Sequence, residues 1–214
     1  MYKKKPFFIV FEGVEGCGKS FQSKKLFNNL KKNSIDAVLT REPGGTKSSE
    51  LIRNLILKDY FNKNSKEKFD KYTDTLLYLA ARNEHVKNKI KPALNKKKVV
   101  ICDRFTDSTI AYQVDGKKVD INFINNIHKK ILEGIKPNIV FILKVSSKSS
   151  KSRLIKRKTK NRYDNFAQSF YAKAQRSFIK LSKNKKNYFV LDSSSNNNIL
   201  EKKIFSIVNK YLKT

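Results

Sequence analysis

The amino-acid sequence predicts an open, doubly wound α/β fold, with a five-stranded parallel sheet flanked by helices. Three observations predict it: five short apolar runs, helical periodicity between successive runs, and 214 residues of which 39% are hydrophobic. That length and composition suffice for one hydrophobic core. Because no linker or internal repeat divides the sequence, we expect a single domain over residues 1–214.

Most of the five expected strands are continuously apolar, whereas a strand with one face in water alternates between apolar and polar residues. We therefore expect all five to be covered on both faces, as in a doubly wound sheet. They are residues 7–11, 37–40, 99–102, 139–143 and 188–191.

The intervals between the strands carry apolar residues three and four positions apart, which predicts helices. The third helix should end before Pro92, because proline lacks the N–H that a helix interior uses. Two polar, turn-rich segments, 58–70 and 193–198, are expected to be surface loops. The expected helices lie within 19–32, 47–57, 73–91, 123–132, 170–181 and 204–211.

The net charge is +30, from 48 Lys and Arg against 18 Asp and Glu. A charge of this size suggests nucleic-acid binding, since a positive field attracts phosphate polymers. However, the charge comes from 40 Lys and only 8 Arg and is spread along the whole chain. We therefore favour a composition-driven surface over a nucleic-acid site, and regard the few arginines, whose planar fork fits phosphate, as the informative basic residues.

No apolar stretch reaches the roughly 20 residues that a membrane-spanning helix needs. The basic start and the apolar run at 7–11 resemble a signal peptide, but Glu12 ends the run and no small-residue cleavage site follows. Cys17 and Cys102 are too few for a disulfide framework or a zinc site. We therefore expect a cytoplasmic protein with reduced thiols and no membrane partner.

Directly after the first expected strand, residues 13–20 read GVEGCGKS, which fits the phosphate-binding pattern G-x-x-x-x-G-K-[ST]. Glycines let the backbone curl its N–H groups around a phosphate at the start of the following helix. Lys19 is expected to reach the β- and γ-phosphates, and the Ser20 hydroxyl to bind Mg²⁺. The expected ATP-binding residues are Gly13, Val14, Glu15, Gly16, Cys17, Gly18, Lys19, Ser20 and Phe21.

This loop indicates a nucleoside triphosphate but does not say which reaction uses it. The guanine-reading element N-K-x-D is absent, because no N-K pair in the sequence is followed by Asp at the fourth position. A translocating ATPase usually needs a larger domain and appended modules. The length therefore favours a small phosphotransferase, whose catalysis is mainly positioning and charge neutralisation.

Two further motifs follow expected strands and should lie at the same sheet edge. Asp103 and Arg104 end the third strand; the first is a candidate Mg²⁺ ligand and the second a candidate phosphate ligand. Residues 41–46, REPGGT, follow the second strand and are expected to form a tight loop and a second anion site.

Together, these motifs resemble thymidylate kinase, the enzyme that transfers phosphate from ATP to dTMP. The resemblance covers residues 7 to about 192 and implies a P-loop nucleoside monophosphate kinase-like fold and a homodimer. Its most specific elements are REPGGT and the STIAYQ segment, more so than the phosphate loop. The motifs are GVEGCGKS, REPGGT, LLYLAAR at 76–82, DRF at 103–105 and STIAYQ at 108–113.

The resemblance also implies roles for individual residues. Arg41 and Arg104 match arginines around the dTMP phosphate, and Glu15 matches the acid that meets the deoxyribose 3′-hydroxyl. Tyr78 stands where the family usually has a Phe stacked on thymine. The remaining matches are Arg82 and Gln113 at the thymine edge, Tyr112 beside the 2′ position and Ser108 beneath the base.

Residues 146–165 form a basic segment expected to close over ATP as a lid. In the family, one subtype keeps an Arg in the phosphate loop and the bacterial subtype keeps catalytic arginines in the lid. Gly16 follows Glu15 here, so the sequence resembles the lid-arginine subtype. We expect Arg157 to be catalytic, supported by Arg153 and Arg162, beside Lys19 and Glu15.

The sequence departs from the family pattern at Lys144, where an Asp is typical, at Ile155, where a lid arginine is typical, and at Cys17, where Ala is more usual. Because Cys17 lies next to a helix N-terminus, we expect its thiol to be oxidation-sensitive in the absence of nucleotide. Two alternatives to a dTMP kinase stay open: a kinase of another nucleoside monophosphate, and a basic nucleic-acid-binding ATPase.

Overall fold

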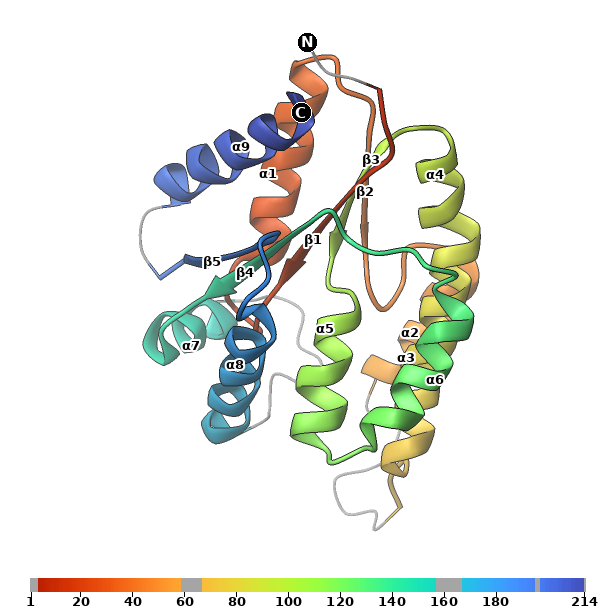
Figure 1. The fold of residues 1–214 in the computed structure, drawn as a ribbon. Helices are drawn as coiled ribbons and strands as arrows, with labels where there is room; N and C mark the ends of the chain where they lie inside the picture. The colour runs from red at the N-terminus through yellow and green to blue at the C-terminus, as the bar shows by residue number, and fades with distance from the viewer. Residues whose placement is uncertain (1–3, 59–66, 157–166, 195–196, 214) are drawn as a thin grey trace.

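The structure is a computed structural model that describes residues 4–58, 67–156, 167–194 and 197–213. Its centre is a five-stranded, fully parallel sheet with the order β2-β3-β1-β4-β5 (Figure 1). The expected strands are confirmed to within one residue at their carboxyl ends. They are β1 (Phe7–Glu12), β2 (Ala37–Arg41), β3 (Val99–Asp103), β4 (Ile139–Lys144) and β5 (Tyr188–Asp192).

The expectation that all five strands are buried was wrong for the two outer ones. In β1 and β3 every residue is buried, whereas β2 and β5 are the edges of the sheet and are partly exposed. Val190, in β5, is 42% exposed. An apolar run is the same in a central and an edge strand, so the sequence pattern did not distinguish them.

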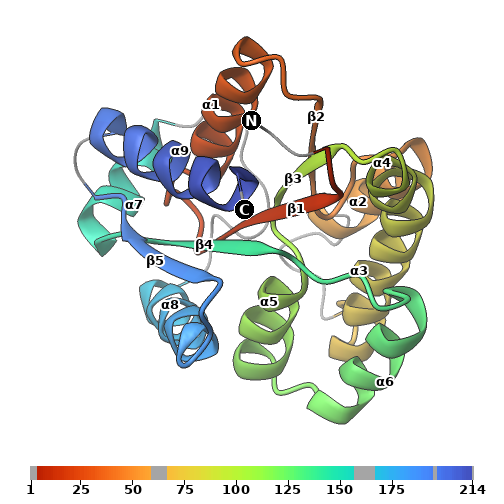
Figure 2. The ribbon, with the colours of Figure 1, turned by 45° about the horizontal axis from the view of Figure 1, so that its top comes forward.

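Helices cover both faces of the sheet. In Figure 2, α1 and α9 lie on one face and α5 and α8 on the other, while α2, α3, α4 and α6 group together beside β3. The helices are α1 (Lys19–Lys32), α2 (Lys47–Leu57), α3 (Lys71–His85), α4 (Lys91–Asn95), α5 (Thr106–Thr109), α6 (Ile121–Ile131), α7 (Ser147–Ile155), α8 (Gln168–Ser182) and α9 (Asn197–Lys213), with π-helical turns η1 (Val86–Ile90) and η2 (Ile110–Gly116).

The prediction that the third helix ends before Pro92 was wrong. After α3, the backbone continues through the π-helical turn η1 into α4, where Pro92 occupies the first turn. Proline is tolerated in the first turn of a helix, where its missing N–H is not needed. The π-helical turn before it replaces the i→i+4 backbone hydrogen bonds by i→i+5 bonds. Of the two expected loops, 59–66 and 195–196 lie outside the described residues, and α9 begins at Asn197.

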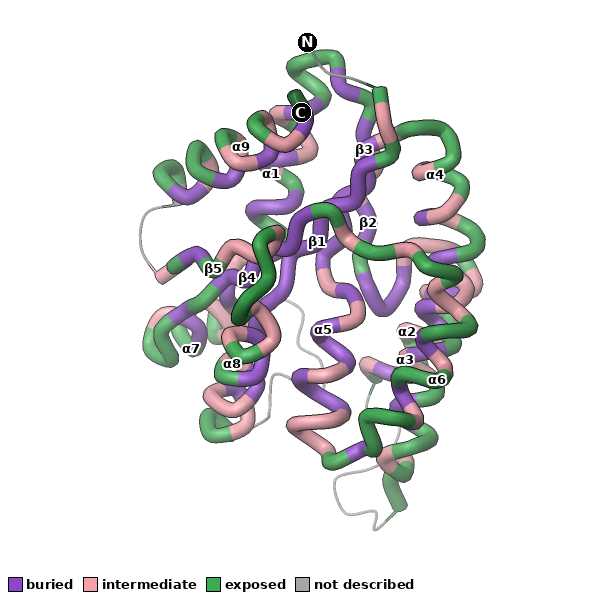
Figure 3. Tube along the Cα trace, in the orientation of Figure 1, coloured by how far each residue is buried: buried purple, intermediate pink, exposed green. Residues whose placement is uncertain are grey.

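The hydrophobic core follows the three central strands, and the tube in Figure 3 is purple along β1 and β3 and along β4 up to Leu143. Five of its largest fully buried side chains are Phe8, Phe11, Phe105, Phe141 and Phe178. Phe8 packs edge-on against Phe105, at 5.0 Å between ring centroids, which joins β1 to the segment after β3. Among the described helices, none is long and apolar enough to cross a membrane.

The chain order places a crevice outside the carboxyl ends of β1 and β3. From β1 the chain runs towards β2, and from β3 it crosses to β4 on the opposite side of β1. Open α/β sheets bind ligands at such a reversal of strand order. The phosphate-binding loop follows β1, and the Asp103–Arg104 pair ends β3, so both motifs meet at this crevice.

The buried carboxyl of Glu12 ties these two strand ends together. Its Oε1 accepts hydrogen bonds from the backbone N–H of Phe105 at 2.8 Å and of Ser108 at 3.2 Å, and the Ser108 hydroxyl lies 2.6 Å from its Oε2. Burial raises the pKa of Glu12 to about 8, and the Asp107 carboxyl adds to this; the hydrogen bonds and the Arg104 charge offset only part.

We therefore predict that Glu12→Gln stabilises the fold increasingly as the pH rises. The folded pKa lies above the ordinary value of 4.5, so the contribution of the wild-type carboxyl is full below that value and is lost as the pH rises through about 8. Gln offers the same donor and acceptor atoms at every pH. In urea unfolding, its advantage should grow from about pH 5 to about pH 9.

The exposed Glu67→Gln serves as the control for losing one negative charge. An advantage of Glu12→Gln that is the same at every pH, or that shrinks as the pH rises, would contradict the assignment.

Candidate active site

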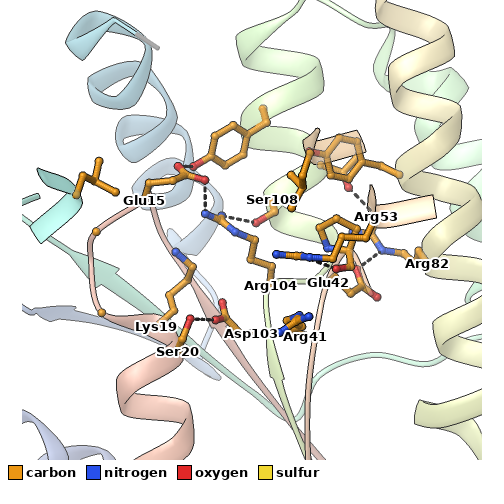
Figure 4. Close-up of a pocket in the computed structure, with 18 of the residues that line it drawn as sticks. Glu15, Lys19, Ser20, Arg41, Glu42, Arg53, Arg82, Asp103, Arg104 and Ser108 are labelled. Carbon is orange, nitrogen blue, oxygen red and sulfur yellow. Dashed lines mark hydrogen bonds and ion pairs between the residues drawn. The ribbon is translucent and has the colours of Figure 1, made fainter. Parts of the chain in front are cut away.

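A cleft of about 520 Å³ opens at the carboxyl ends of β1 and β3 (Figure 4). Its walls come from the phosphate-binding loop, the loop after β2, the end of β3, and helices α2, α3, α5 and α7. Most of the residues predicted for ATP, Mg²⁺ and dTMP line it. They are Glu15, Gly16, Gly18, Lys19, Ser20, Phe21, Arg41, Tyr78, Arg82, Asp103, Arg104, Ser108, Tyr112, Gln113 and Arg153.

Two glycines of the phosphate-binding loop are required by close packing. A Cβ on Gly13 would lie 2.6 Å from the Leu143 carbonyl oxygen of β4, and one on Gly16 would lie 2.7 Å from the Ser150 carbonyl oxygen of α7. Both glycines also have positive φ values, 138° and 72°, which L side chains rarely adopt. The loop is therefore clamped between β4 and α7 with its other side free to face the cleft.

The helix that follows the loop has an open N-terminus. Gly18 is its N-cap, no side chain in the described part of the chain caps it, and its first turn carries no acid. Such a terminus offers N–H groups and a positive dipole end to a phosphate. The buried Lys19 Nζ donates to the Val14 carbonyl oxygen at 2.8 Å and so lies folded against the loop.

The Ser20 hydroxyl hydrogen-bonds to the Asp103 carboxylate, which confirms that the two predicted Mg²⁺ ligands lie together. Both offer the hard oxygen donors that Mg²⁺ prefers. This ion usually binds through one or two protein oxygens, substrate phosphates and water, so two ligands fit it. No cluster of three or more His, Cys, Asp or Glu with metal-site geometry occurs in the described ranges.

Glu15 and Arg104 form a partly buried ion pair in the cleft. The Arg104 Nη2 donates to Glu15 Oε1 at 2.6 Å, and the Tyr112 hydroxyl donates to Glu15 Oε2 at 2.5 Å. Burial alone would raise the pKa of Glu15, but the Arg104 and Lys19 charges and the bond from Tyr112 lower it below its ordinary value. Glu15 is thus held as a carboxylate facing the cleft.

The Arg104 guanidinium is further fixed by its other contacts. Its Nη1 donates to the Gly13 carbonyl oxygen at 3.0 Å and to Ser108 Oγ at 3.1 Å, and the group stacks over the Tyr112 ring at 5.2 Å. The backbone φ of Arg104 is 73°, a value uncommon outside glycine. The turn that Glu12 braces therefore aims this side chain across the cleft.

Arg82, predicted at the thymine edge, is almost entirely buried at the far end of the cleft. It donates from Nε to Glu42 Oε2 at 2.7 Å, from Nη1 to Thr109 Oγ1 at 2.7 Å and from Nη2 to the Phe105 carbonyl oxygen at 2.9 Å. A further bond, of 2.8 Å, joins its Nη1 to His128 Nε2. These contacts fix the plane of the guanidinium.

Glu42, from the REPGGT segment, balances the Arg82 charge. Its other oxygen, Oε1, lies 3.0 Å from His85 Nδ1, and the Nε2 of that ring lies 2.6 Å from Thr40 Oγ1. Burial alone would raise the pKa of Glu42, but Arg82 and His85 lower it. A Cβ on Gly45 would lie 2.4 Å from Thr40 Oγ1, so the second glycine of REPGGT lets the loop approach this network.

Gln113 brings an unsatisfied donor to the cleft. The residue is 2% exposed, and its Nε2 has no hydrogen-bond partner within the described residues. Leaving a buried amide unpaired costs roughly 1–3 kcal/mol, so such atoms mark places where a ligand or water is needed. Tyr78, half-buried on α3, lines the same cleft.

Arg53, which belongs to none of the sequence motifs, lies on α2 and points into the cleft (Figure 4). Its Nη1 donates to the Pro43 carbonyl oxygen at 2.6 Å. Burial lowers the pKa of its guanidinium, and the Arg41 charge adds to this. The signal was available: Arg is scarce in this chain, and five of its eight arginines line the cleft, namely Arg41, Arg53, Arg82, Arg104 and Arg153.

Arg41 lies at the rim rather than deep in the cleft. Its Nη2 contacts both carboxylate oxygens of Glu50 at 3.1 Å, and its side chain is 54% exposed. The same carboxylate accepts the Gly45 N–H at 2.9 Å. In this structure Arg41 therefore braces the REPGGT loop from outside.

The basic segment after β4 begins as α7, and its Arg153 contacts the phosphate-binding loop. Nη1 of this arginine donates to the Gly16 carbonyl oxygen at 3.2 Å and Nη2 to the Ser193 carbonyl oxygen at 2.6 Å. Arg157 and Arg162 lie outside the described residues, so their expected roles stay predictions. Of the two departures in this region, Lys144 lies beside Asp192 across the β4–β5 pair, and Ile155 is 69% exposed.

Three of the predicted ATP-binding residues, Gly13, Val14 and Cys17, do not line the cleft and instead form the buried underside of the loop. Cys17 is fully buried. Burial raises the pKa of its thiol, and the nearby Lys19 and Arg104 charges offset only part of that effect. Because a buried, protonated thiol is a poor nucleophile, the structure contradicts our expectation of oxidation sensitivity.

Comparisons with known proteins agree with this geometry. The family model described as "Thymidylate kinase" matches residues 11–204. The chain is 39% identical to the thymidylate kinase of Wolbachia pipientis subsp. Culex pipiens (strain wPip), in an alignment that covers 95% of this chain and 96% of the relative. It is also 39% identical to the thymidylate kinase of Aster yellows witches'-broom phytoplasma (strain AYWB), in an alignment that covers 96% of each chain.

A solved structure of thymidylate kinase from Ehrlichia chaffeensis has a TM-score of 0.74 and 31% identity, and the alignment covers 95% of this chain and 99% of that one. The match thus extends over the sheet, the cleft and the flanking helices. The chain belongs to the thymidylate kinase family.

Proposed function

We propose that the chain transfers the γ-phosphoryl group of ATP to dTMP, with Mg²⁺, and so forms dTDP for dTTP synthesis. The observation that carries this proposal is one cleft with two dissimilar ends. One end holds the open N-terminus of α1 with Lys19, and the other holds arginines and an unsatisfied amide. The first suits a triphosphate, and the second suits a nucleoside monophosphate with a polar base.

The acceptor phosphate fits between the arginines of the cleft. Arg104 is pre-aimed by its bonds to Gly13 and Glu15, and Arg53 approaches from α2 on the opposite wall. Guanidinium groups bind phosphate through paired N–H donors. The acceptor oxygen is already anionic at neutral pH, so these residues position it and screen its charge without a general base.

The sugar and base sites follow from the remaining wall. Glu15 is an acceptor suited to a ribose hydroxyl, and Tyr112, bonded to it, narrows the space beside that hydroxyl. Tyr78 supplies an aromatic face, Gln113 a free donor for a base oxygen, and Ser108 a small polar side chain between Glu12 and Arg104. These assignments make deoxythymidine the best-fitting nucleoside.

On the donor side, Ser20 and Asp103 would hold Mg²⁺, which supplies charge neutralisation at the phosphates. Lys19 is placed to leave its Val14 contact for the transferring phosphoryl group. We further propose a single domain over residues 1–214 with a lid at 146–165, in which Arg153 is already seated on the phosphate-binding loop and Arg157 and Arg162 add positive charge.

An acceptor panel tests the proposed function. Purified protein is incubated with ATP, Mg²⁺ and dTMP, dUMP, CMP, AMP or GMP, and ADP release is measured. We expect the highest kcat/KM with dTMP. A clear preference for another monophosphate would overturn the acceptor assignment. ADP release that requires added DNA or RNA, and falls steeply with salt, would favour the nucleic-acid-binding ATPase instead.

We also propose that the chain forms a homodimer through α2 and α3, which pack on each other and leave four apolar side chains exposed. These are Leu51, Leu55, Tyr72 and Leu76. Sedimentation velocity measures the oligomeric state directly. A cytoplasmic location is supported by Cys17 and Cys102, both buried as free thiols, which suits a reducing compartment.

Lys19→Ala is predicted to lower kcat by about 10²- to 10³-fold, because one preorganised donor to the transferring group is lost. Binding of dTMP, measured by calorimetry, should change by less than about threefold, since Lys19 lies at the donor end. Lys24→Ala, at an exposed position of the same helix, is the matched control. A kcat within about tenfold of wild type would contradict the role.

Arg104→Ala is predicted to raise KM for dTMP by about 10- to 100-fold, since a charge-assisted phosphate contact is worth about 1.5–3 kcal/mol. KM for ATP should change far less. The matched control is Arg41→Ala at the rim, for which we expect a smaller rise. Equal effects of Arg104→Ala on both substrates would show that it acts on the fold of the loop.

A further inference from the structure

His128 is a buried titratable residue that the proposed mechanism does not use. It lies on α6, is 8% exposed and is not among the residues that line the cleft. Its Nε2 lies 2.8 Å from Nη1 of Arg82, which does line the cleft. The ring therefore stands directly behind a residue placed at the acceptor base.

The proton positions on this ring follow from its partner. A guanidinium only donates, so His128 Nε2 must be the bare, accepting nitrogen, and the proton of the neutral ring is on Nδ1. Burial lowers the pKa of His128 to about 3, and the Arg82 charge adds to this, while Glu42 opposes it. The imidazole is consequently neutral at every pH at which the enzyme is expected to work.

Arg82 is held by acceptors from four separate parts of the chain. They are Glu42 after β2, Phe105 after β3, Thr109 in α5 and His128 in α6. Since a guanidinium has five N–H groups, these four bonds leave one, on Nη2, for a ligand. The contact with His128 occupies the second N–H of Arg82 Nη1. It therefore keeps the Arg82 guanidinium from rotating so that Nη1 faces the cleft.

We propose that His128 is a positioning residue for the acceptor base: it holds Arg82 so that the one remaining N–H, on Nη2, is presented to the base in the cleft. This inference rests on the proposed function, because it takes a base with an acceptor oxygen, as thymine has, to be the group that Arg82 meets. His128 itself touches no substrate. It acts only through Arg82, by fixing the orientation of the guanidinium and by accepting a hydrogen bond from one of its N–H groups.

Loss of this acceptor has a defined consequence. Without His128 Nε2, a buried N–H of Arg82 lacks a partner, and the guanidinium gains by turning towards another acceptor. Because the base is remote from the transferring phosphoryl group, the effect should fall on acceptor binding rather than on the donor end. A change of about tenfold corresponds to about 1.4 kcal/mol, within the range for an unsatisfied buried donor.

The test compares His128→Leu, which removes the acceptor, with His128→Gln, whose amide oxygen can replace Nε2. Ile124→Ala is the matched control, because Ile124 is fully buried one turn earlier on the same helix and its apolar side chain cannot form a hydrogen bond to Arg82. For each variant, ADP release gives kcat and KM for dTMP and for ATP, and thermal unfolding gives Tm. His128→Asn, whose shorter amide does not reach Arg82, serves as a second polar variant.

We expect His128→Leu and His128→Asn to raise KM for dTMP by about tenfold, with KM for ATP unchanged, and His128→Gln to return KM for dTMP to within about threefold of wild type. Ile124→Ala should lower Tm without changing either KM. If His128→Leu does not fold, the comparison of Gln with Asn carries the same test.

An unchanged KM for dTMP in His128→Leu or His128→Asn would overturn the inference. So would equal rises in KM for dTMP and ATP that His128→Gln fails to reverse, since that pattern reflects general loss of structure. Failure of the wild type to phosphorylate dTMP would instead refute the proposed function, which separates the two results.

Discussion

The in-register parallel pairing of β1 with β3 is the constraint on which the rest of the site depends. Phe11 pairs with Asp103, so the phosphate-binding loop and Arg104 leave the sheet side by side. The Arg104 N–H then donates to the Phe11 carbonyl oxygen at 2.9 Å, which extends the pairing past the strand end. This junction therefore sets how the phosphate-binding loop, Asp103 and Arg104 lie relative to one another.

Two arginines of the cleft are each paired with a glutamate, which balances the charge of the guanidinium and also fixes its position. Arg82 with Glu42 is a buried ion pair with an N–O distance of 2.7 Å, and Arg104 with Glu15 is a partly buried one with a distance of 2.6 Å. Removing one partner of such a pair leaves an uncompensated buried charge, which costs several kcal/mol. The arginines can therefore be held at fixed positions before any nucleotide arrives, so less ordering is left for the binding step.

The strands and most of the cleft could be predicted from the sequence because each rests on a local signal. Apolar runs predict the strands, and the GVEGCGKS and REPGGT spacings predict loops whose glycines the packing indeed requires. Other features depend on tertiary contacts that no local pattern contains. Whether β5 is central or at an edge, whether Pro92 interrupts the helix, and which helix faces Arg53 into the cleft are all decided by packing.

The same limit applies to His128, Glu12 and Cys17. His128 and Glu12 are single residues of common types, and their roles arise from partners 46 and 93 or more positions away in the chain. Cys17 was misjudged for the opposite reason. Its place before a helix N-terminus suggested a reactive thiolate, but the clamp of the loop against β4 removes it from water, and burial prevails.

The unpartnered Nε2 of Gln113 has a consequence for how the free protein balances stability against selectivity. A buried donor without an acceptor makes the nucleotide-free fold less stable than an apolar residue of the same shape would. A ligand or water that places an acceptor oxygen beside this donor removes the deficit. Under the function proposed above, in which Gln113 meets the acceptor base, recognition draws on this unsatisfied donor, so selection for recognition works against selection for maximal stability.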